Sequence, residues 1–164
     1  MMNLLFSPSG RIGPAAYMKG MIIIGVVGAL LALLGLVSPA LGMIGSLVSL
    51  VLLYAFFALG IKRSHDAGKT GWLSITHFLL LMLVSTIFTW IALKLFGLDI
   101  GDMFGSAMGG DTAAVDEFTT RSVIPSAIAS VVTYPVTAYI VNMLNPHDPT
   151  PNQYGTIVDG ATFD

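Results

Sequence analysis

Apolar residues along this chain gather in four long runs, and shorter segments between them carry most of the polar and charged residues. The runs cover residues 17–37, 41–61, 72–96 and 123–144. Each run has about 20 residues or more, enough to cross ~30 Å of hydrocarbon at ~1.5 Å per helical residue. The pattern predicts an all-α fold, a polytopic transmembrane helical bundle of four spans, with a flexible acidic loop at 98–122.

The composition agrees with lipid as the solvent of this bundle. The chain is 55% hydrophobic and 10% charged, whereas an average soluble domain has about 45–50% apolar and about 25% charged residues. A net charge of −2 gives no basic face for a nucleic-acid partner. The absence of cysteine excludes a disulfide framework and a thiolate nucleophile.

Basic residues in the short connections predict the orientation, because lysine and arginine stay on the cytoplasmic side. The basic residues that decide it are Arg11, Lys19, Lys62, Arg63 and Lys69. Arg11 precedes the first run, Lys19 lies at its start, and the other three lie between the second and third runs, whereas the 98–122 segment is mainly acidic. We therefore expect both termini inside, with residues 1–144 forming the membrane domain and residues 145–164 a polar cytoplasmic tail.

A cleaved signal peptide is the alternative interpretation of the first run, because small residues at 38–40 resemble a cleavage site. Signal-peptide cores have only about 7–15 apolar residues. The uninterrupted stretch 21–37 is longer than that. We therefore interpret the first run as a span.

Small residues recur at helical spacing in the first two runs: Gly25, Gly28, Ala32 and Gly35, then Gly42, Gly45, Ser46 and Ser49. Such stripes let membrane helices approach closely, which favours a packed hairpin over a homo-oligomer contact. The fourth run places its hydroxyl residues on one face, around Pro135: Ser126, Ser130, Thr133 and Thr137. Helix packing is favoured there over a polar pathway, because no charged residue lies in the run.

The densest polar segment is 62–72, between the second and third runs. We predict that the second helix ends before Gly68 and that Thr70 caps the third. Gly68-Lys69-Thr70 resembles the end of a phosphate-binding loop, but the first glycine of that motif and the preceding strand are missing. Ser64, His65 and Asp66 are consecutive, so their side chains diverge around a helix and form no nucleophile relay.

Three motifs resemble one family: Gly10-Arg11 with Tyr17, the Arg63-to-Trp72 segment, and Asn152-Gln153-Tyr154-Gly155. The chain looks like the bacterial inner-membrane family known as domain of unknown function 805, over nearly its whole length apart from 98–122. The sequence departs from the family pattern at Pro14, Leu73 and Gln153. The resemblance implies a four-span fold and a bacterial inner (plasma) membrane location, with no activity attached.

The predicted topology brings these motifs together on the cytoplasmic side. The candidate binding residues are Arg11, Tyr17, Arg63, His65, Asp66, Lys69, Trp72 and Tyr154. Arginine and lysine donors suit an anionic lipid headgroup, although basic residues that only set topology are equally typical of inside loops. No ligand spacing requires a metal at His65, Asp66, His147 and Asp148, so we predict no metal, no cofactor and no catalytic residue.

Three functions stay open on these residues. The first is a non-enzymatic module that binds membrane lipids or a membrane-protein partner, including a second copy of itself, at its cytoplasmic face. The second is a small transporter or channel subunit that uses the polar face of the fourth helix. The third is an enzyme acting on a lipid headgroup, with His65 as acid or base and Asp66 as its charge partner.

Overall fold

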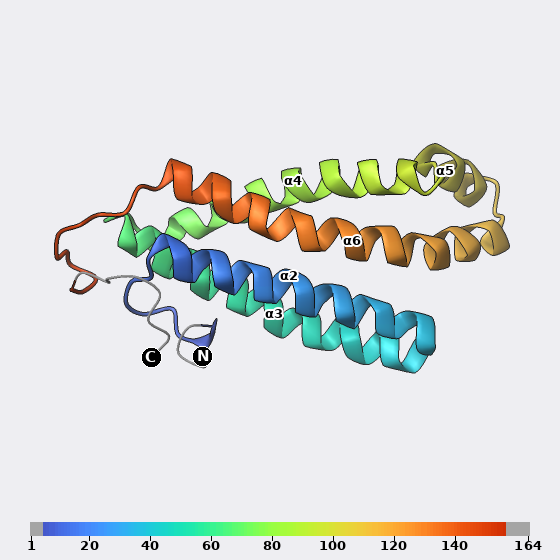
Figure 1. The fold of residues 1–164 in the computed structure, drawn as a ribbon. Helices are drawn as coiled ribbons and strands as arrows, with labels where there is room; N and C mark the ends of the chain where they lie inside the picture. Colours follow the sequence, from blue (N-terminus) through green and yellow to red (C-terminus); the bar gives the residue numbers. More distant parts are fainter. Residues whose placement is uncertain (1–4, 157–164) are drawn as a thin grey trace.

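The computed structural model describes residues 5–156 and confirms the all-α fold. Its elements are α2 (Pro14–Val37), α3 (Pro39–Asp66), η1 (Gly71–Leu73), α4 (Ser74–Leu95), α5 (Ile100–Met108) and α6 (Thr112–Leu144) (Figure 1). In the described part of the chain, β-structure is limited to an isolated bridge between Asn152 and Gly155. Helices α2, α3 and α6, and η1 with α4, are each long and apolar enough to cross a membrane.

Helices α2 and α3 form the predicted hairpin, and the residues at its turn explain how tightly it closes. The Ser38 side chain accepts a hydrogen bond from Leu41 N, and Pro39 occupies the first helical position, where a missing N–H costs nothing. A Cβ added at Gly45 would lie 2.7 Å from the carbonyl oxygen of Leu31. Gly25 instead faces α6, where an added Cβ would lie 3.0 Å from Tyr134 Cβ. The small residues therefore serve two different helix contacts.

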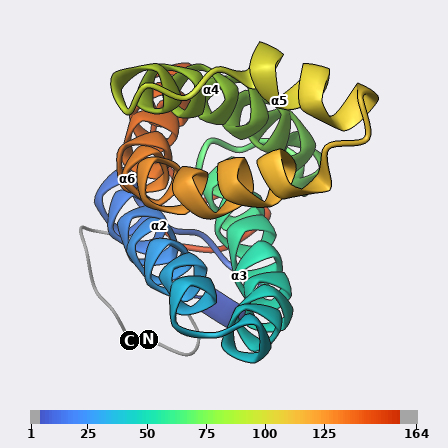
Figure 2. The ribbon, with the colours of Figure 1, turned by 90° about the vertical axis from the view of Figure 1, so that its right-hand side faces the viewer.

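The spans are packed in the order α3, α2, α6, α4. Helices α3 and α4 approach each other near one end, where Phe56 and Phe57 pack against Phe78. The two helix pairs α2/α3 and α4/α6 separate toward the other end (Figures 1 and 2). We call the first the terminal end, because residues 5–13 and 145–156 lie there, and the second the α5 end.

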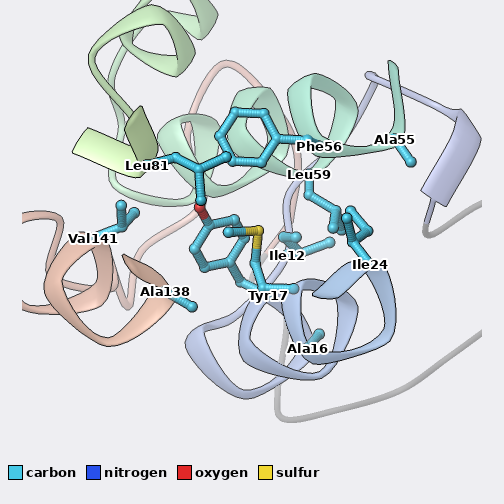
Figure 3. Close-up of a cluster of buried hydrophobic side chains, with 11 residues drawn as sticks. Ile12, Ala16, Tyr17, Ile24, Ala55, Phe56, Leu59, Leu81, Ala138 and Val141 are labelled. Atoms are coloured by element: carbon cyan, nitrogen blue, oxygen red, sulfur yellow. The ribbon is translucent and has the colours of Figure 1, made fainter. Parts of the chain in front are cut away.

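The core lies near the terminal end and draws on all four spans (Figure 3). Helix α2 contributes Tyr17, Met21 and Ile24, so the first apolar run is an integral part of the fold. Large apolar side chains on the outside of the bundle remain exposed, among them Met43, Leu47, Leu79 and Leu83. This arrangement suits a bundle whose solvent is hydrocarbon.

The structure corrects the prediction of a loop at 98–122. The chain turns at Gly97, whose φ of +70° favours glycine. Asp99 then caps α5 by accepting from Gly101 N, and Asp111 caps α6 by accepting from Ala114 N. Helix α6 has 33 residues, about 50 Å at ~1.5 Å per residue, which is longer than a perpendicular crossing of ~30 Å of hydrocarbon requires.

Candidate functional site at the terminal end

Helix α3 ends before Gly68, as predicted, whereas Thr70 caps the short η1 and not α4 itself. Ala67 is the C-cap and Gly68 has a φ of +69°, a conformation that terminates helices and favours glycine. Thr70 then caps η1, with its hydroxyl 3.5 Å from Trp72 N. The last turn of α3 is thereby held against the bundle, and Arg63 and Asp66 are both buried.

Asp66 is the centre of a network of two ion pairs with arginines and one contact with a histidine. Its Oδ2 lies 2.7 Å from Arg63 Nη1 and 2.8 Å from His147 Nδ1, and its Oδ1 lies 3.3 Å from Arg11 Nη2. The side chains of both arginines and of Asp66 are fully buried, whereas that of His147 is 29% exposed. A carboxylate saturated in this way has no free lone pair directed at the outside of the bundle.

The two arginines direct their remaining donors into the protein. Arg11 Nη1 donates to Thr150 O at 2.8 Å, and its Nη2 donates to Asp148 O at 2.5 Å. Arg63 Nε donates to Asn142 Oδ1 at 2.7 Å, and its Nη2 donates to Asn145 O. These bonds fasten residues 145–155 to the ends of α3 and α6. We call this set of bonds around Arg11, Arg63 and Asp66 the tail clasp.

The charges of the tail clasp fit the helix ends that meet there. Helices α3 and α6 both terminate at this point, and a helix C-terminus carries roughly half a negative charge on its free carbonyl groups. Lys69 Nζ adds a bond of 2.9 Å to Asn145 Oδ1 and one of 3.4 Å to Leu144 O. The positive charges of Arg11, Arg63 and Lys69 that Asp66 does not neutralise therefore face the C-terminal ends of α3 and α6. This is a structural role.

His65 does not pair with Asp66, although the enzyme hypothesis expected that pair. Its Nδ1 lies 3.1 Å from Gly10 O, and its ring stacks on Tyr154 with 3.8 Å between ring centroids. Because a carbonyl only accepts, Nδ1 carries the proton in this bond. The histidine that contacts Asp66 is His147, from the segment after α6.

Tyr17 and Trp72, the remaining aromatic residues of the predicted set, lie in opposite environments. Tyr17 is fully buried in the core (Figure 3). Its ring is tilted against that of His77, with 6.3 Å between the ring centroids. It is therefore a packing residue and offers no outward surface. Trp72 is 78% exposed at the start of η1.

Trp72 borders a hollow between α3 and the start of α4, which we call the α3–α4 groove. Its volume is about 480 Å³, and it is lined by Phe57, Ile61, Thr70, Gly71, Trp72, Ser74 and Ile75. Gly71 keeps it open, because an added Cβ would lie 2.9 Å from Ile61 Cγ2 and 3.2 Å from His65 Nε2. His65 therefore lies next to Gly71, one of the residues that line this groove.

Asp148 orders the segment after α6 through bonds to Thr150. Asp148 Oδ1 accepts from the Thr150 hydroxyl at 2.6 Å and from Thr150 N at 3.0 Å. These bonds hold the pKa of the Asp148 carboxyl below its usual value, since they favour the ionised form. Across the described residues, no cluster of three histidine or acidic side chains is arranged to hold a metal ion.

Sequence reasoning missed the side chains that join the helices behind the clasp. Asn142 accepts from Arg63 and donates to Pro14 O at 3.1 Å, so it links α6 to α3 and α2. Asn145 Nδ2 lies 3.1 Å from His77 Nε2, on α4. The available signal was the amide of Asn142 inside an apolar run, since polar groups at membrane depth need internal partners.

Four long apolar helices with a polar network closing one end define a polytopic helical membrane protein. The chain belongs to the DUF805 family, whose description reads "protein of unknown function", and the family model matches residues 5–156. Comparison with curated proteins and with solved structures gave no match.

Proposed function

We propose that this protein is a non-enzymatic module of the bacterial inner membrane, oriented with both termini inside, that binds a membrane lipid in the α3–α4 groove. The observation that carries the proposal is the position of this groove. Its walls belong to the apolar spans, Thr70 lines its polar edge, and His65 lies beside the lining residue Gly71. An acyl chain fits the walls and a headgroup fits the polar edge.

The level of the groove within the bilayer supports a lipid over a protein partner. Trp72 and Trp90 lie 18 positions apart, about 27 Å along a helix, which is close to the ~30 Å hydrocarbon thickness. Tryptophan prefers the two membrane interfaces. With Trp72 at one interface, the groove opens sideways to the lipids of that leaflet.

The hydrogen-bond acceptor that His65 offers beside the groove limits which lipid headgroups can bind there. Arg11 and Arg63 direct their donors inward to the tail clasp, so an anionic headgroup finds no free guanidinium there. With the Nδ1 proton donated to Gly10 O, the Nε2 atom of an uncharged His65 ring is an acceptor. The ligand is therefore a phospholipid whose headgroup donates one, through an ammonium or a hydroxyl group.

The test uses the two tryptophans as separate reporters. Trp90→Phe leaves Trp72 beside the groove, and Trp72→Phe leaves Trp90 as the matched control at the other end of α4. Each variant is titrated in detergent with brominated phospholipids that quench tryptophan fluorescence. Phosphatidylethanolamine and phosphatidylglycerol carry headgroup donors, whereas phosphatidylcholine carries none.

We expect Trp72 to be quenched at lower concentrations of the two donor lipids than of phosphatidylcholine, and Trp90 to make no distinction. His65→Ala in the Trp72-only protein is expected to remove the preference while leaving quenching itself in place. Equal quenching of Trp72 by all three lipids would reduce the groove to part of the ordinary lipid-facing surface and contradict the proposal.

A further inference from the structure

We infer that α5 lies in the membrane interface opposite the terminal end, with Phe104 and Met108 inserted among the lipids. The first support is the amphipathic pattern of this helix. Its apolar residues are Ile100, Met103, Phe104, Ala107 and Met108. These positions follow the spacing of one helical face, and Phe104 is 61% and Met108 90% exposed.

The depth of α5 follows from the return of the chain after α4. Ile100, its first residue, lines a hollow of about 600 Å³ together with Thr86 and Trp90 of α4. The turn at Gly97 therefore brings the chain back to the level of Trp90. That level is a membrane interface if the two tryptophans mark the two boundaries.

The direction of α5 agrees with a position along the membrane surface. Helix α5 runs crosswise to the long helices at its end of the bundle (Figure 2). Asp102 and Ser106 of α5 line a hollow of about 190 Å³ that faces Glu117 and Arg121 of α6. Met103 also lines this hollow, so the side of α5 that carries Asp102 and Ser106 faces α6, whereas Phe104 and Met108 do not line it and are exposed.

The charge of α5 defines the lipid surface that it fits. The stretch 100–108 contains one acidic residue, Asp102, and no lysine or arginine. Most interfacial helices add attraction between basic residues and anionic lipids to apolar burial. Helix α5 has the apolar part alone, so its insertion needs no anionic lipid.

The cysteine-free chain allows a direct test with spin labels. Phe104→Cys and Met108→Cys report on the apolar side, and Asp102→Cys is the matched control two positions away on the other side. Each full-length variant is labelled and reconstituted into phosphatidylcholine vesicles, with and without phosphatidylglycerol. Collisions with oxygen, which concentrates in lipid, are compared with collisions with a water-soluble nickel chelate.

We expect labels at 104 and 108 to be accessible to oxygen and protected from the chelate, and the label at 102 to show the reverse. The pattern is expected to be the same in both vesicle compositions. Equal access of the chelate to all three positions would place α5 in water and overturn the inference. Protection of 104 and 108 from both reagents would also overturn it, since a protein contact would then cover them.

Discussion

At the terminal end, Asp66 is buried and bonded to Arg11, Arg63 and His147, whereas at the α5 end Glu117 and Arg121 form a pair in which both side chains are more than half exposed. The first network brings Arg11 and His147 from distant parts of the chain to the end of α3, whereas the second joins only neighbours one helical turn apart. Burial makes the difference in energy, because water screens the exposed pair and is excluded from the buried one. Ion pairs thus hold the fold together at the terminal end, whereas the pair at the α5 end contributes little to stability.

Removing the buried carboxylate of Asp66 is expected to change the stability of the protein most. Asp66→Ala leaves two buried guanidinium groups without their counter-charge, and we expect it to lower the free energy of unfolding by about 3–5 kcal/mol. Glu117→Ala at the exposed pair is expected to cost about 0–1 kcal/mol. Reversible unfolding in detergent titrations compares the two, and equal losses would contradict the distinction between the ends.

A second prediction concerns the α2–α3 hairpin, which is closed by close contact without charge. Gly45→Ala places a methyl group 2.7 Å from the Leu31 carbonyl oxygen, and we expect a loss of about 1–3 kcal/mol from overpacking. Gly28→Ala is the matched control, because its added Cβ meets only Leu52 Cδ1, at 3.8 Å. The same unfolding titration tests both variants, and a Gly28→Ala loss as large as that of Gly45→Ala would refute this account.

A smaller effect is expected where the tail meets His65. Tyr154→Ala removes the ring that stacks on His65, an interaction of about 0.5–1.5 kcal/mol. We expect faster proteolysis within residues 145–156, with the spans unaffected. Tyr139→Ala, at a tyrosine that is 60% exposed on α6, is the control and should leave tail proteolysis unchanged.

The smallest effect is a dependence on pH at Asp148. Its pKa is lowered in the folded protein by the Thr150 hydroxyl and amide. The stabilisation is therefore fully present above the unfolded value of about 3.9 and is lost as the pH falls through the folded pKa. The Thr150 amide resonance reports this titration by NMR. Thr150→Val should move its midpoint upward, and an unchanged midpoint would show that the hydroxyl bond has no influence.

The four spans could be predicted from the sequence because a bilayer imposes both a length and an apolar composition on each helix. The end of α3 was also predictable, since Gly68 and Thr70 are local signals. Helix α5 was missed because the glycines at 101, 105, 109 and 110 and the neighbouring acidic residues are typical of a loop. The caps at Asp99 and Asp111, each followed by apolar residues, were the signals against that interpretation.

The sequence could predict which residues gather at the terminal end, but not which of them bond to one another. Topology alone brought Arg11, Arg63 and Asp66 to one end of the bundle. It could not show that His147 replaces His65 beside Asp66, because that choice depends on where the segment after α6 folds back. The inward direction of both arginines likewise depends on tertiary packing, and this direction separates a structural clasp from a headgroup site.

The most direct test of this central claim is the chemical accessibility of the three arginines in the folded protein. Phenylglyoxal modifies exposed guanidinium groups, and peptide mass spectrometry after treatment in detergent gives the extent of modification at each position. The tail clasp predicts modification of Arg121 with protection of Arg11 and Arg63 until the protein is unfolded. Modification of Arg11 or Arg63 at the rate of Arg121 would contradict the clasp and return these side chains to the outer surface.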